Sequence, residues 1–404
     1  MKRTVIVIGQ SYSGRLSIAR SVAEIGCEVI LIALVPYRKD GKSLYDVKPI
    51  DGYSKYVKDV YYCSNKDGEG IIKILLEKCT DENSKPIIIP DNDLSAAVVD
   101  KHFDVLKAHF LLPHMKEGAE SVSAWMDKIK QKSRAVEMGL QVVDYKFVEI
   151  RNAKYEIPSG IQYPCFAKPL RSTVGGKVGL RKCNSESELI DHLNSLSRYK
   201  NIDFLIEDFK EIEKEFAVLG FSDGENVIIP GILEILQLAH GSHYGVAIQG
   251  KVYPVTAEHE KLVGLFKEYV RSIGFVGIFD IDYFKSGDVL YFGELNLRFG
   301  GSGYAYTKMG VNLPEMFVRY VCGMSYKDMP NEVSGSATYV NERMLVDEWL
   351  MGFISKKEFR RLFYSSDIKF VESQEDKEPF REMKKRTRID HMKILLKSII
   401  WKRG

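Results

Sequence analysis

Several patterns are missing from this 404-residue chain, and each absence excludes a class of protein. No two of its six cysteines have CxxC spacing, so we expect scattered reduced thiols and no zinc site. No apolar run approaches the roughly 20 residues of a membrane span, and the first one is too short for a signal peptide. The net charge of +3 is close to neutral and predicts no nucleic-acid partner. These features favour a cytoplasmic globular protein of two or three domains.

The start of the chain has the pattern of a parallel α/β fold. A β-branched run at 4–9 is followed by a turn, a helix at 15–25 and a second strand at 28–34. This is the βαβ opening of a doubly wound sheet. The G-x-G-x-x-G fingerprint of dinucleotide sites is incomplete, because Ser11 stands where glycine is needed. We therefore predict a Rossmann-like domain over 1–115 without a dinucleotide site.

A polar tripeptide follows a later strand of this domain. Asp91, Asn92 and Asp93 come directly after the apolar strand at 86–90. In open sheets, ligands bind beyond the carboxyl ends of the strands, so these residues are candidates for a site. They are equally well suited to cap the next helix.

The stretch 277–303 predicts a β-hairpin whose turn lies at 285–288. Strand side chains alternate between two faces, so five polar residues are expected on one face: Asp280, Asp282, Glu294, Asn296 and Arg298. Carboxylate and amide oxygens suit Mg²⁺ that also binds substrate phosphates. An arginine beside them suits phosphate or carboxylate. The alternative is the charged outer face of an ordinary hairpin.

A glycine-rich loop at 172–179 follows a short strand that ends in Lys168-Pro169. Glycines allow a backbone to close over a phosphate chain. The loop is not a Walker P-loop, because Arg171 and Val178 occupy positions that need Gly and Ser or Thr. An ordinary hairpin turn is the alternative.

Six motifs occur in order: a helical Lys, Phe-Ala-Lys-Pro, the glycine-rich loop, Ile-Glu-Asp-Phe, Lys-Glu-Phe-Ala-Val, and the pair Phe-Asp with Glu-Leu-Asn-Leu-Arg. Together, over 121–324, they resemble the ATP-grasp superfamily of carboxylate–amine ligases, most of all its carbamoyl-phosphate-synthase-like and D-aspartate-ligase-like branch. The resemblance implies an α/β and α+β architecture. A pre-ATP-grasp domain over 1–115 would precede an ATP-grasp domain over 116–330, with its nucleotide-binding subdomain at about 140–215. A helical, basic segment would follow over 331–404.

The resemblance also implies site residues. Those assigned to ATP are Lys128, Lys168, Ser172, Gly175, Gly176, Glu207, Asp208, Phe209 and Glu215. The loop would cover the β- and γ-phosphates, Glu207 and the 208–209 backbone would receive adenine, and Glu215 would bind the ribose. Lys130 and Lys132 are alternatives for the first lysine.

Metal and substrate positions follow from the same resemblance. Asp280, Glu294 and Asn296 would hold two Mg²⁺ ions, or Mn²⁺, while Asp282 is left with a solvated or substrate-side role. Arg298 and Lys168 would be catalytic. His243, Gly301 and Ser302 would border the substrate, with His240 as a further candidate and a polar surface loop as the alternative for both histidines.

The reaction that the resemblance implies joins a carboxylate of amino-acid type to an amine through an acyl-phosphate, with ADP and phosphate released. No nucleophilic Ser or Cys is required. A phosphotransferase or carboxylase on the same ATP cradle, or a catalytically silent nucleotide-binding module, is the alternative. Small-molecule substrates and a homodimer are the expected partners.

The C-terminal segment contains a predicted helix at 346–363 and a basic tail from Arg381 onwards. Lysines and arginines in this tail are interleaved with apolar residues and a Trp. Such a helix can lie on an anionic membrane surface, which predicts a peripheral membrane contact. A terminal helix that packs on the protein is the alternative.

Overall fold

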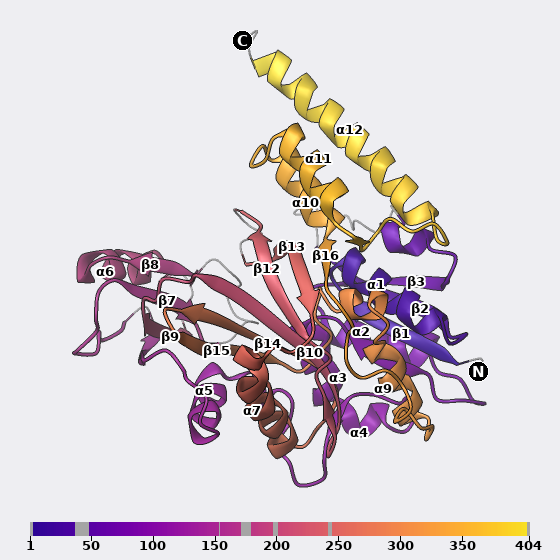
Figure 1. Cartoon of the computed structure of the whole chain (residues 1–404), viewed down its shortest axis with the longest axis horizontal. Helices are drawn as coiled ribbons and strands as arrows, with labels where there is room; N and C mark the ends of the chain where they lie inside the picture. Colours follow the sequence, from indigo (N-terminus) through magenta and orange to yellow (C-terminus); the bar gives the residue numbers. More distant parts are fainter. Residues whose placement is uncertain are drawn as a thin grey trace.

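The computed structural model describes residues 3–36, 48–152, 154–170, 179–196, 201–240 and 245–401, with side chains of the last helix described as far as Ile394. This part of the chain forms three β-sheets with helices packed around them. Figure 1 shows the N-terminal sheet at one end, a small sheet at the other end and the largest sheet between them. None of the helices in the described ranges is both long and apolar enough to cross a membrane.

The N-terminal sheet is parallel and has the strand order β3-β2-β1-β4. Its elements are β1 (Thr4–Gly9), α1 (Tyr12–Ala23), β2 (Glu28–Val35), η2 (Ile50–Tyr53), β3 (Val57–Ser64), α2 (Gly68–Lys78), β4 (Ile87–Pro90), α3 (Asp93–Lys101) and α4 (Phe103–Leu106). The β-branched runs of β1 and β2 are buried, as expected for central parallel strands. The predicted α/β fold is therefore confirmed. Helix α1 begins earlier than expected, because the Ser11 side chain accepts the Gly14 N–H and caps it.

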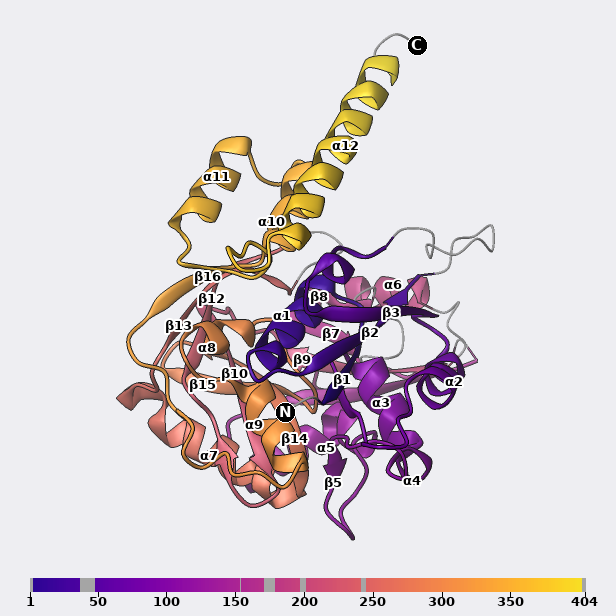
Figure 2. The same cartoon turned by 90° about the vertical axis from the view of Figure 1, so that its right-hand side faces the viewer.

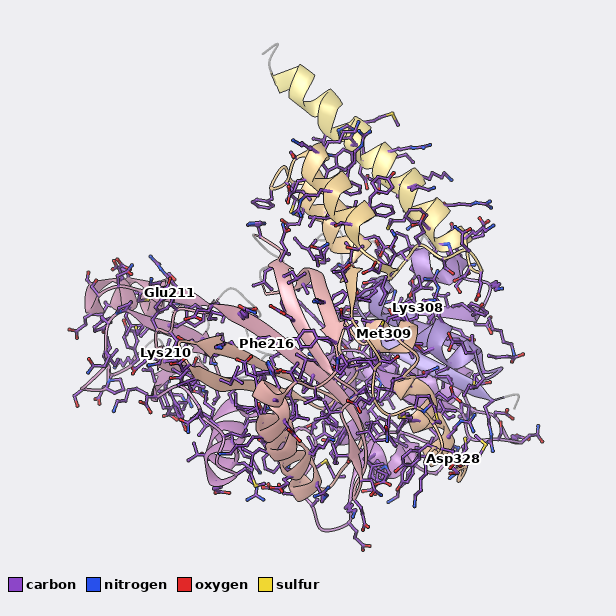
Figure 3. The ribbon with its side chains drawn as sticks, viewed as in Figure 1. Lys210, Glu211, Phe216, Lys308, Met309 and Asp328 are labelled. Carbon is purple, nitrogen blue, oxygen red and sulfur yellow. The ribbon has the colours of Figure 1, made fainter. Side chains whose placement is uncertain are left out.

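The largest sheet has the order β15-β14-β10-β12-β13-β16-β17, with β11 paired to β10 and β5 paired to β14. Its strands are β5 (His114–Met115), β10 (Lys214–Asp223), β11 (Val227–Ile228), β12 (Ile232–Leu238), β13 (Ala247–Tyr253), β14 (Phe275–Ser286), β15 (Val289–Asn296), β16 (Ala337–Val340) and β17 (Ile368–Lys369). Helix α7 (Ala257–Ile273) packs against it through an apolar face that includes Phe266. Figure 3 shows Phe216 of β10 near the centre of the molecule.

A shared core joins the largest sheet to the N-terminal sheet. Helices α8 (Tyr304–Lys308) and α9 (Leu313–Val321) lie between them. Phe317 of α9 belongs to the same buried cluster as Val22 of α1 and Phe221 of β10. The carboxyl ends of the parallel strands are thereby held against the polar hairpin, since the Phe299 N–H donates to Pro90 O at 3.3 Å.

The small sheet is antiparallel, with the order β6-β9-β7-β8. It contains β6 (Tyr145–Arg151), β7 (Cys165–Pro169), β8 (Arg181–Cys183), α6 (Glu186–Ser195) and β9 (Asn201–Asp208), and follows η3 (Ala124–Met126) and α5 (Lys128–Glu137). Helix α5 starts at Lys128 because the Asp127 side chain accepts the Ile129 and Lys130 N–H groups.

The C-terminal segment contains α10 (Glu342–Leu350), α11 (Lys356–Ser365) and α12 (Glu378–Trp401). The single helix expected at 346–363 is wrong. Two helices occur there, because Gly352 adopts a positive φ of 81° just past the end of α10. Strands β16 and β17 belong to the largest sheet, so this segment is built into the body. The domain limits at 115 and 330 stay predictions.

Candidate active site

The polar hairpin is formed by β14 and β15, joined at Gly287-Asp288. Asp280 pairs across the strands with Asn296, and Asp282 pairs with Glu294. The Asn296 Nδ2 donates to Asp282 Oδ2 at 3.3 Å. The apolar residues between them, Leu295 and Leu297, are 2% and 4% exposed. The alternation expected from the sequence thus brings the acidic and amide groups onto one face.

Arg298 links this hairpin to the N-terminal sheet. Its Nε donates to Asp93 Oδ1 at 2.9 Å and its Nη1 donates to Asp280 Oδ2 at 3.3 Å. Burial lowers the pKa of the guanidinium, but Asp93 and Asp280 outweigh it and hold the pKa above its ordinary value. Burial raises the pKa of Asp280 to about 6, against the opposing effect of Arg298. The sequence left the loop at 91–93 open between a ligand site and a helix cap. The contact with Arg298 brings Asp93 into the site.

The other two residues of that loop have different surroundings. Asn92 caps α3 in a reciprocal capping box with Ser95. Both carboxylate oxygens of Asp91 are shielded from water. They lie against Gly9, where a Cβ would come within 1.4 Å of Asp91 Oδ1. Burial raises the pKa of Asp91 to about 7.

A second charged group lies on the small sheet. Glu207 of β9 receives two cations at one oxygen: Lys168 Nζ lies 2.7 Å and Lys132 Nζ 2.9 Å from Glu207 Oε1. Neither lysine meets the geometry of a regular hydrogen bond to Glu207 Oε1, so the two contacts are ion pairs. Burial opposes ionisation of Glu207, but the two lysines outweigh it and lower its pKa. The Lys132 side chain is 2% exposed, and desolvation lowers its pKa.

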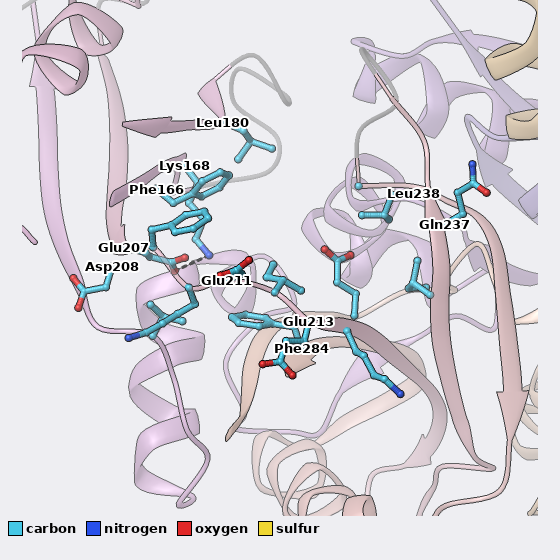
Figure 4. Close-up of a pocket in the computed structure, with 18 of the residues that line it drawn as sticks. Phe166, Lys168, Leu180, Glu207, Asp208, Glu211, Glu213, Gln237, Leu238 and Phe284 are labelled. Atoms are coloured by element: carbon cyan, nitrogen blue, oxygen red, sulfur yellow. Dashed lines mark ion pairs between the residues drawn. The ribbon is translucent and has the colours of Figure 1, made fainter. Parts of the chain in front are cut away.

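Two adjoining cavities connect these groups. The larger, of about 750 Å³, lies between the small sheet and β12, and Figure 4 shows Lys168 and Glu207 on one wall with Leu238 on the other. The smaller, of about 400 Å³, contains Asp280, Asp282 and Arg298. Residues that line both cavities are Ile212, Glu215, Ile235, Leu238, Gly245 and Phe284. Glu215 therefore lies at the junction, and desolvation raises its pKa.

The oxygen groups fit a hard cation that keeps phosphate ligands. Asp280 Oδ1 is buried and finds no hydrogen-bond partner among the described residues. Glu294 Oε2 lies 3.5 Å from Lys128 Nζ. Within the described ranges, no three His, Cys, Asp or Glu side chains are gathered closely enough to hold a metal by themselves. Such a cation would thus need phosphate oxygens and water to complete its coordination.

Asp282 lines the smaller cavity, and its side chain is exposed there. Protein atoms pack closely around the other sides of the residue. Desolvation, together with the nearby carboxylates of Asp280 and Glu294, raises its pKa. Its position opposite Glu294 leaves both roles considered for it, substrate side or solvated, as predictions.

The strand-end residues expected at adenine line the larger cavity: Glu207, Asp208 and Phe209. The Asp208 N–H already donates to Asp144 O at 3.0 Å, and the Phe209 N–H donates to Pro164 O at 3.1 Å. Recognition of a base by the backbone at these two residues would therefore use their carbonyl oxygens.

The remaining candidates divide into three groups. Ser172, Gly175, Gly176 and His243 lie outside the described residues. Gly301 and Ser302 line the smaller cavity, where Ser302 Oγ accepts from the Tyr339 hydroxyl at 3.2 Å. His240 is engaged elsewhere, because its Nδ1 lies 2.6 Å from the buried Glu348 and its ring stacks on Phe353.

Sequence reasoning undervalued two residues. The motif admits Lys132 only as an alternative to Lys128 for the first nucleotide lysine. In the structure both lysines lie on one face of α5, one turn apart, where Lys128 meets Glu294 and Lys132 meets Glu207. Asp93 lies outside the hairpin motifs, so they do not indicate it as a site residue. Its position directly after a parallel strand is the sequence feature that points to the site.

Comparison with known proteins agrees with this geometry. Residues 133–315 match the family profile described as ATP-grasp domain. The chain contains an ATP-grasp domain. Among curated relatives, the carbamoyl phosphate synthase large chain of Clostridium botulinum (strain Alaska E43 / Type E3) is 30% identical over 173 residues, which is 41% of this chain and 16% of that one. The chain thus spans about a sixth of the length of this relative.

Solved structures resemble the ATP-grasp fold of this chain at low identity. N5-carboxyaminoimidazole synthetase from Staphylococcus aureus, complexed with ADP, has a TM-score of 0.60 at 17% identity, over 84% of this chain and 82% of that one. L-amino acid ligase from Bacillus licheniformis has a TM-score of 0.61 at 16% identity, over 83% and 79%. The biotin carboxylase domain dimer of the Hydrogenobacter thermophilus 2-oxoglutarate carboxylase, in complex with MgADP, ADP and bicarbonate, has a TM-score of 0.62 at 18% identity, over 84% and 74%. The predicted architecture is confirmed at the level of fold.

Proposed function

We propose that this protein is an ATP-dependent ligase that joins a carboxylate, of amino-acid type, to an amine through an acyl-phosphate. The observation that carries the proposal is the continuity of the two cavities. The Lys168–Glu207 pair lies in the larger one, and the Asp280–Arg298 pair lies in the smaller one. A triphosphate extended from the first to the second would meet acceptors for a base, cations, and oxygen ligands for Mg²⁺ in that order.

Each end of this path has a chemical role in the proposal. Phe166, Leu180 and the 208–209 carbonyl groups would hold adenine, and Glu215 would bind the ribose. Asp280, Glu294 and Asn296 would hold magnesium or manganese, which would neutralise charge on the triphosphate. Lys128, beside Glu294, would contact the phosphates at that end.

Arg298 and Lys168 are the proposed catalytic cations. The substrate carboxylate attacks the γ-phosphorus, a new O–P bond forms, and ADP leaves with the electrons of the broken P–O bond. The amine then attacks the acyl carbon, loses a proton and displaces phosphate. Arg298 is held by two carboxylates and so is oriented before substrate arrives. Gly301 and Ser302 would border the carboxylate in the same cavity.

The experiment is a screen for ADP release over amino acids and small carboxylates, each with and without an amine acceptor. We expect release that depends on both substrates and yields an amide. Glu294→Ala and Lys168→Ala should each abolish it, through lost metal or phosphate contacts. Lys73→Ala, on the exposed surface of α2, is a matched control. A phosphorylated or carboxylated product would favour the other ATP-dependent reactions, and binding without turnover would favour a silent module.

Sedimentation would test the accompanying proposal that the chain forms a homodimer. A monomer at micromolar concentration would contradict it.

A further inference from the structure

The last helix, α12, has two faces with different surroundings. Its inner face packs on the body: Met383 is 4% exposed and shares a cluster with Val346 of α10. The Arg386 Nη2 donates to Lys48 O at 2.5 Å, and the His391 ring lies 4.7 Å from the ring of Trp349. These contacts fix the orientation of the helix through its first four turns. The alternative of a tail packed on the protein is therefore correct for this face.

The outer face is a stripe of exposed residues, of which Lys384 also contacts its own helix, with Nζ 4.5 Å from the centre of the Phe380 ring. Its residues are spaced three or four apart and are all exposed: Arg381, Lys384, Lys385, Arg388, Ile389 and Met392. This spacing places them on one side of the helix, opposite Met383, with His391 at the border between the two faces. We call this surface the basic stripe.

The charges of the basic stripe are only partly compensated. Arg381 pairs with Glu378, and Lys385 Nζ lies 3.9 Å from Glu382 Oε2. Lys384 and Arg388 have no acidic partner in the part of the chain that the structure describes. The apolar end of the stripe is open as well, with Ile389 38% and Met392 55% exposed.

Charge is distributed unevenly along the whole chain. Residues 378–404 contain nine Lys or Arg and three Asp or Glu, a net charge of +6, whereas the whole chain is only +3. The remainder is therefore net −3. The sequence from 395 to 401 adds five apolar residues, Leu395, Leu396, Ile399, Ile400 and Trp401. Figures 1 and 2 both show α12 extending beyond α10 and α11, away from the three sheets.

We propose that the basic stripe docks the protein on an anionic lipid surface. Four cations next to exposed Ile and Met side chains match a surface of negative headgroups over an apolar layer. A nucleic acid would satisfy the cations but would leave the apolar end in water. Because α12 is anchored on its inner face, the helix would lie on the membrane without leaving the body. The proposal is independent of the reaction at the ATP-grasp site.

Co-sedimentation of the full chain with vesicles tests this proposal. The probes are vesicles of phosphatidylcholine alone and vesicles containing about one third phosphatidylserine. We expect pelleting only with the anionic vesicles, and loss of pelleting at about 0.5 M salt, where screening is strong. Equal pelleting with both vesicles, pelleting that persists in high salt, or none with either would overturn the proposal.

Charge variants locate the surface. R381Q/K384Q/K385Q/R388Q should weaken vesicle binding by about fivefold per charge, several hundredfold in total. The control K73Q/K78Q/K101Q/K107Q removes four exposed cations from the N-terminal domain and should bind as the unaltered chain does. Equal loss in both variants would mean that net charge alone decides binding and would overturn the assignment.

An apolar variant and a competing ligand complete the test. I389S/M392S, which keeps every charge, should bind anionic vesicles at least about tenfold more weakly, because two apolar side chains no longer enter the interface. Unchanged binding would overturn the proposal. Anisotropy with a single-stranded oligonucleotide provides the comparison with nucleic acid. Tight binding to it, together with weak binding to vesicles, would assign the stripe to nucleic acid instead.

Discussion

The ion pairs of Glu207 allow a prediction with a defined magnitude. Glu207→Gln removes one negative charge that compensates two lysines within 3 Å of it. Lys168 lies at the cavity and can turn towards water, with its side chain 16% exposed. Lys132 cannot, because its side chain is 2% exposed and lies beside Val143 O and the ring of Tyr145. The substitution therefore leaves a buried ammonium without its counter-charge.

Removal of one partner of a buried ion pair costs about 3–5 kcal/mol. With a denaturant slope of about 2–3 kcal/mol per molar urea, the unfolding midpoint should fall by about 1–2 M. Lys132→Met in the same chain removes the stranded charge and keeps the volume. The double variant should therefore recover at least about 2 kcal/mol of the loss.

The sign of the pH dependence is an internal check. Desolvation already lowers the pKa of Lys132, and Glu207 opposes that shift. Without Glu207, the folded pKa falls further below the unfolded value near 10.5, so the unfolded chain binds more protons. The stability of Glu207→Gln should thus rise as pH increases towards 10.5, relative to the unaltered protein.

Urea unfolding of the three variants, followed by circular dichroism and tryptophan fluorescence, measures these changes. Lys132→Met alone is the control, and it should cost less than Glu207→Gln because Glu207 keeps Lys168. A Glu207→Gln variant within about 1 kcal/mol of the parent, or a double variant no more stable than Glu207→Gln, would refute the reasoning.

Three further predictions concern the junction of the N-terminal sheet and the hairpin. Arg298→Met should lower turnover at least about 100-fold in an ADP-release assay while nucleotide still binds by calorimetry; unchanged turnover would contradict a catalytic role. Burial raises the pKa of Asp91 from 3.8 to about 7, so the folded chain retains a proton that the unfolded chain loses. The parent should therefore lose up to about 4 kcal/mol relative to Asp91→Asn as pH rises through that interval, and equal urea profiles across it would exclude the shift. Gly9→Ala places a Cβ 1.4 Å from Asp91 Oδ1 and should cost about 1–3 kcal/mol, which Asp91→Ala in the same chain should largely restore; a stable single variant would count against this packing.

Local sequence was sufficient for the parallel sheet and the polar hairpin. The run of β-branched residues at 4–9 favours a strand of the kind that is buried on both faces, and the structure buries it so. The alternation around Glu294 and Asn296 specifies which side chains share a face, because the strand period is two. Helix limits were less accurate where a single cap decided them, as at Ser11 before α1 and Gly352 after α10.

The partners of the charged side chains could not be predicted from local sequence. Arg298 meets Asp93 across 205 positions of sequence, and Lys132 meets Glu207 because α5 packs beside the small sheet. His240 shows the opposite case, in which a candidate site residue is engaged outside the site. Its ring hydrogen-bonds to Glu348, 108 positions away in the sequence.

The sequence by itself thus determined the local elements and the face on which each polar group lies, because hydrophobic periodicity acts over a few neighbouring residues. Only the tertiary structure decided which of those groups meet, which carboxylates keep a raised pKa and which face of α12 remains open. Those properties depend on burial and on distances between segments far apart in the chain, and no local pattern encodes them.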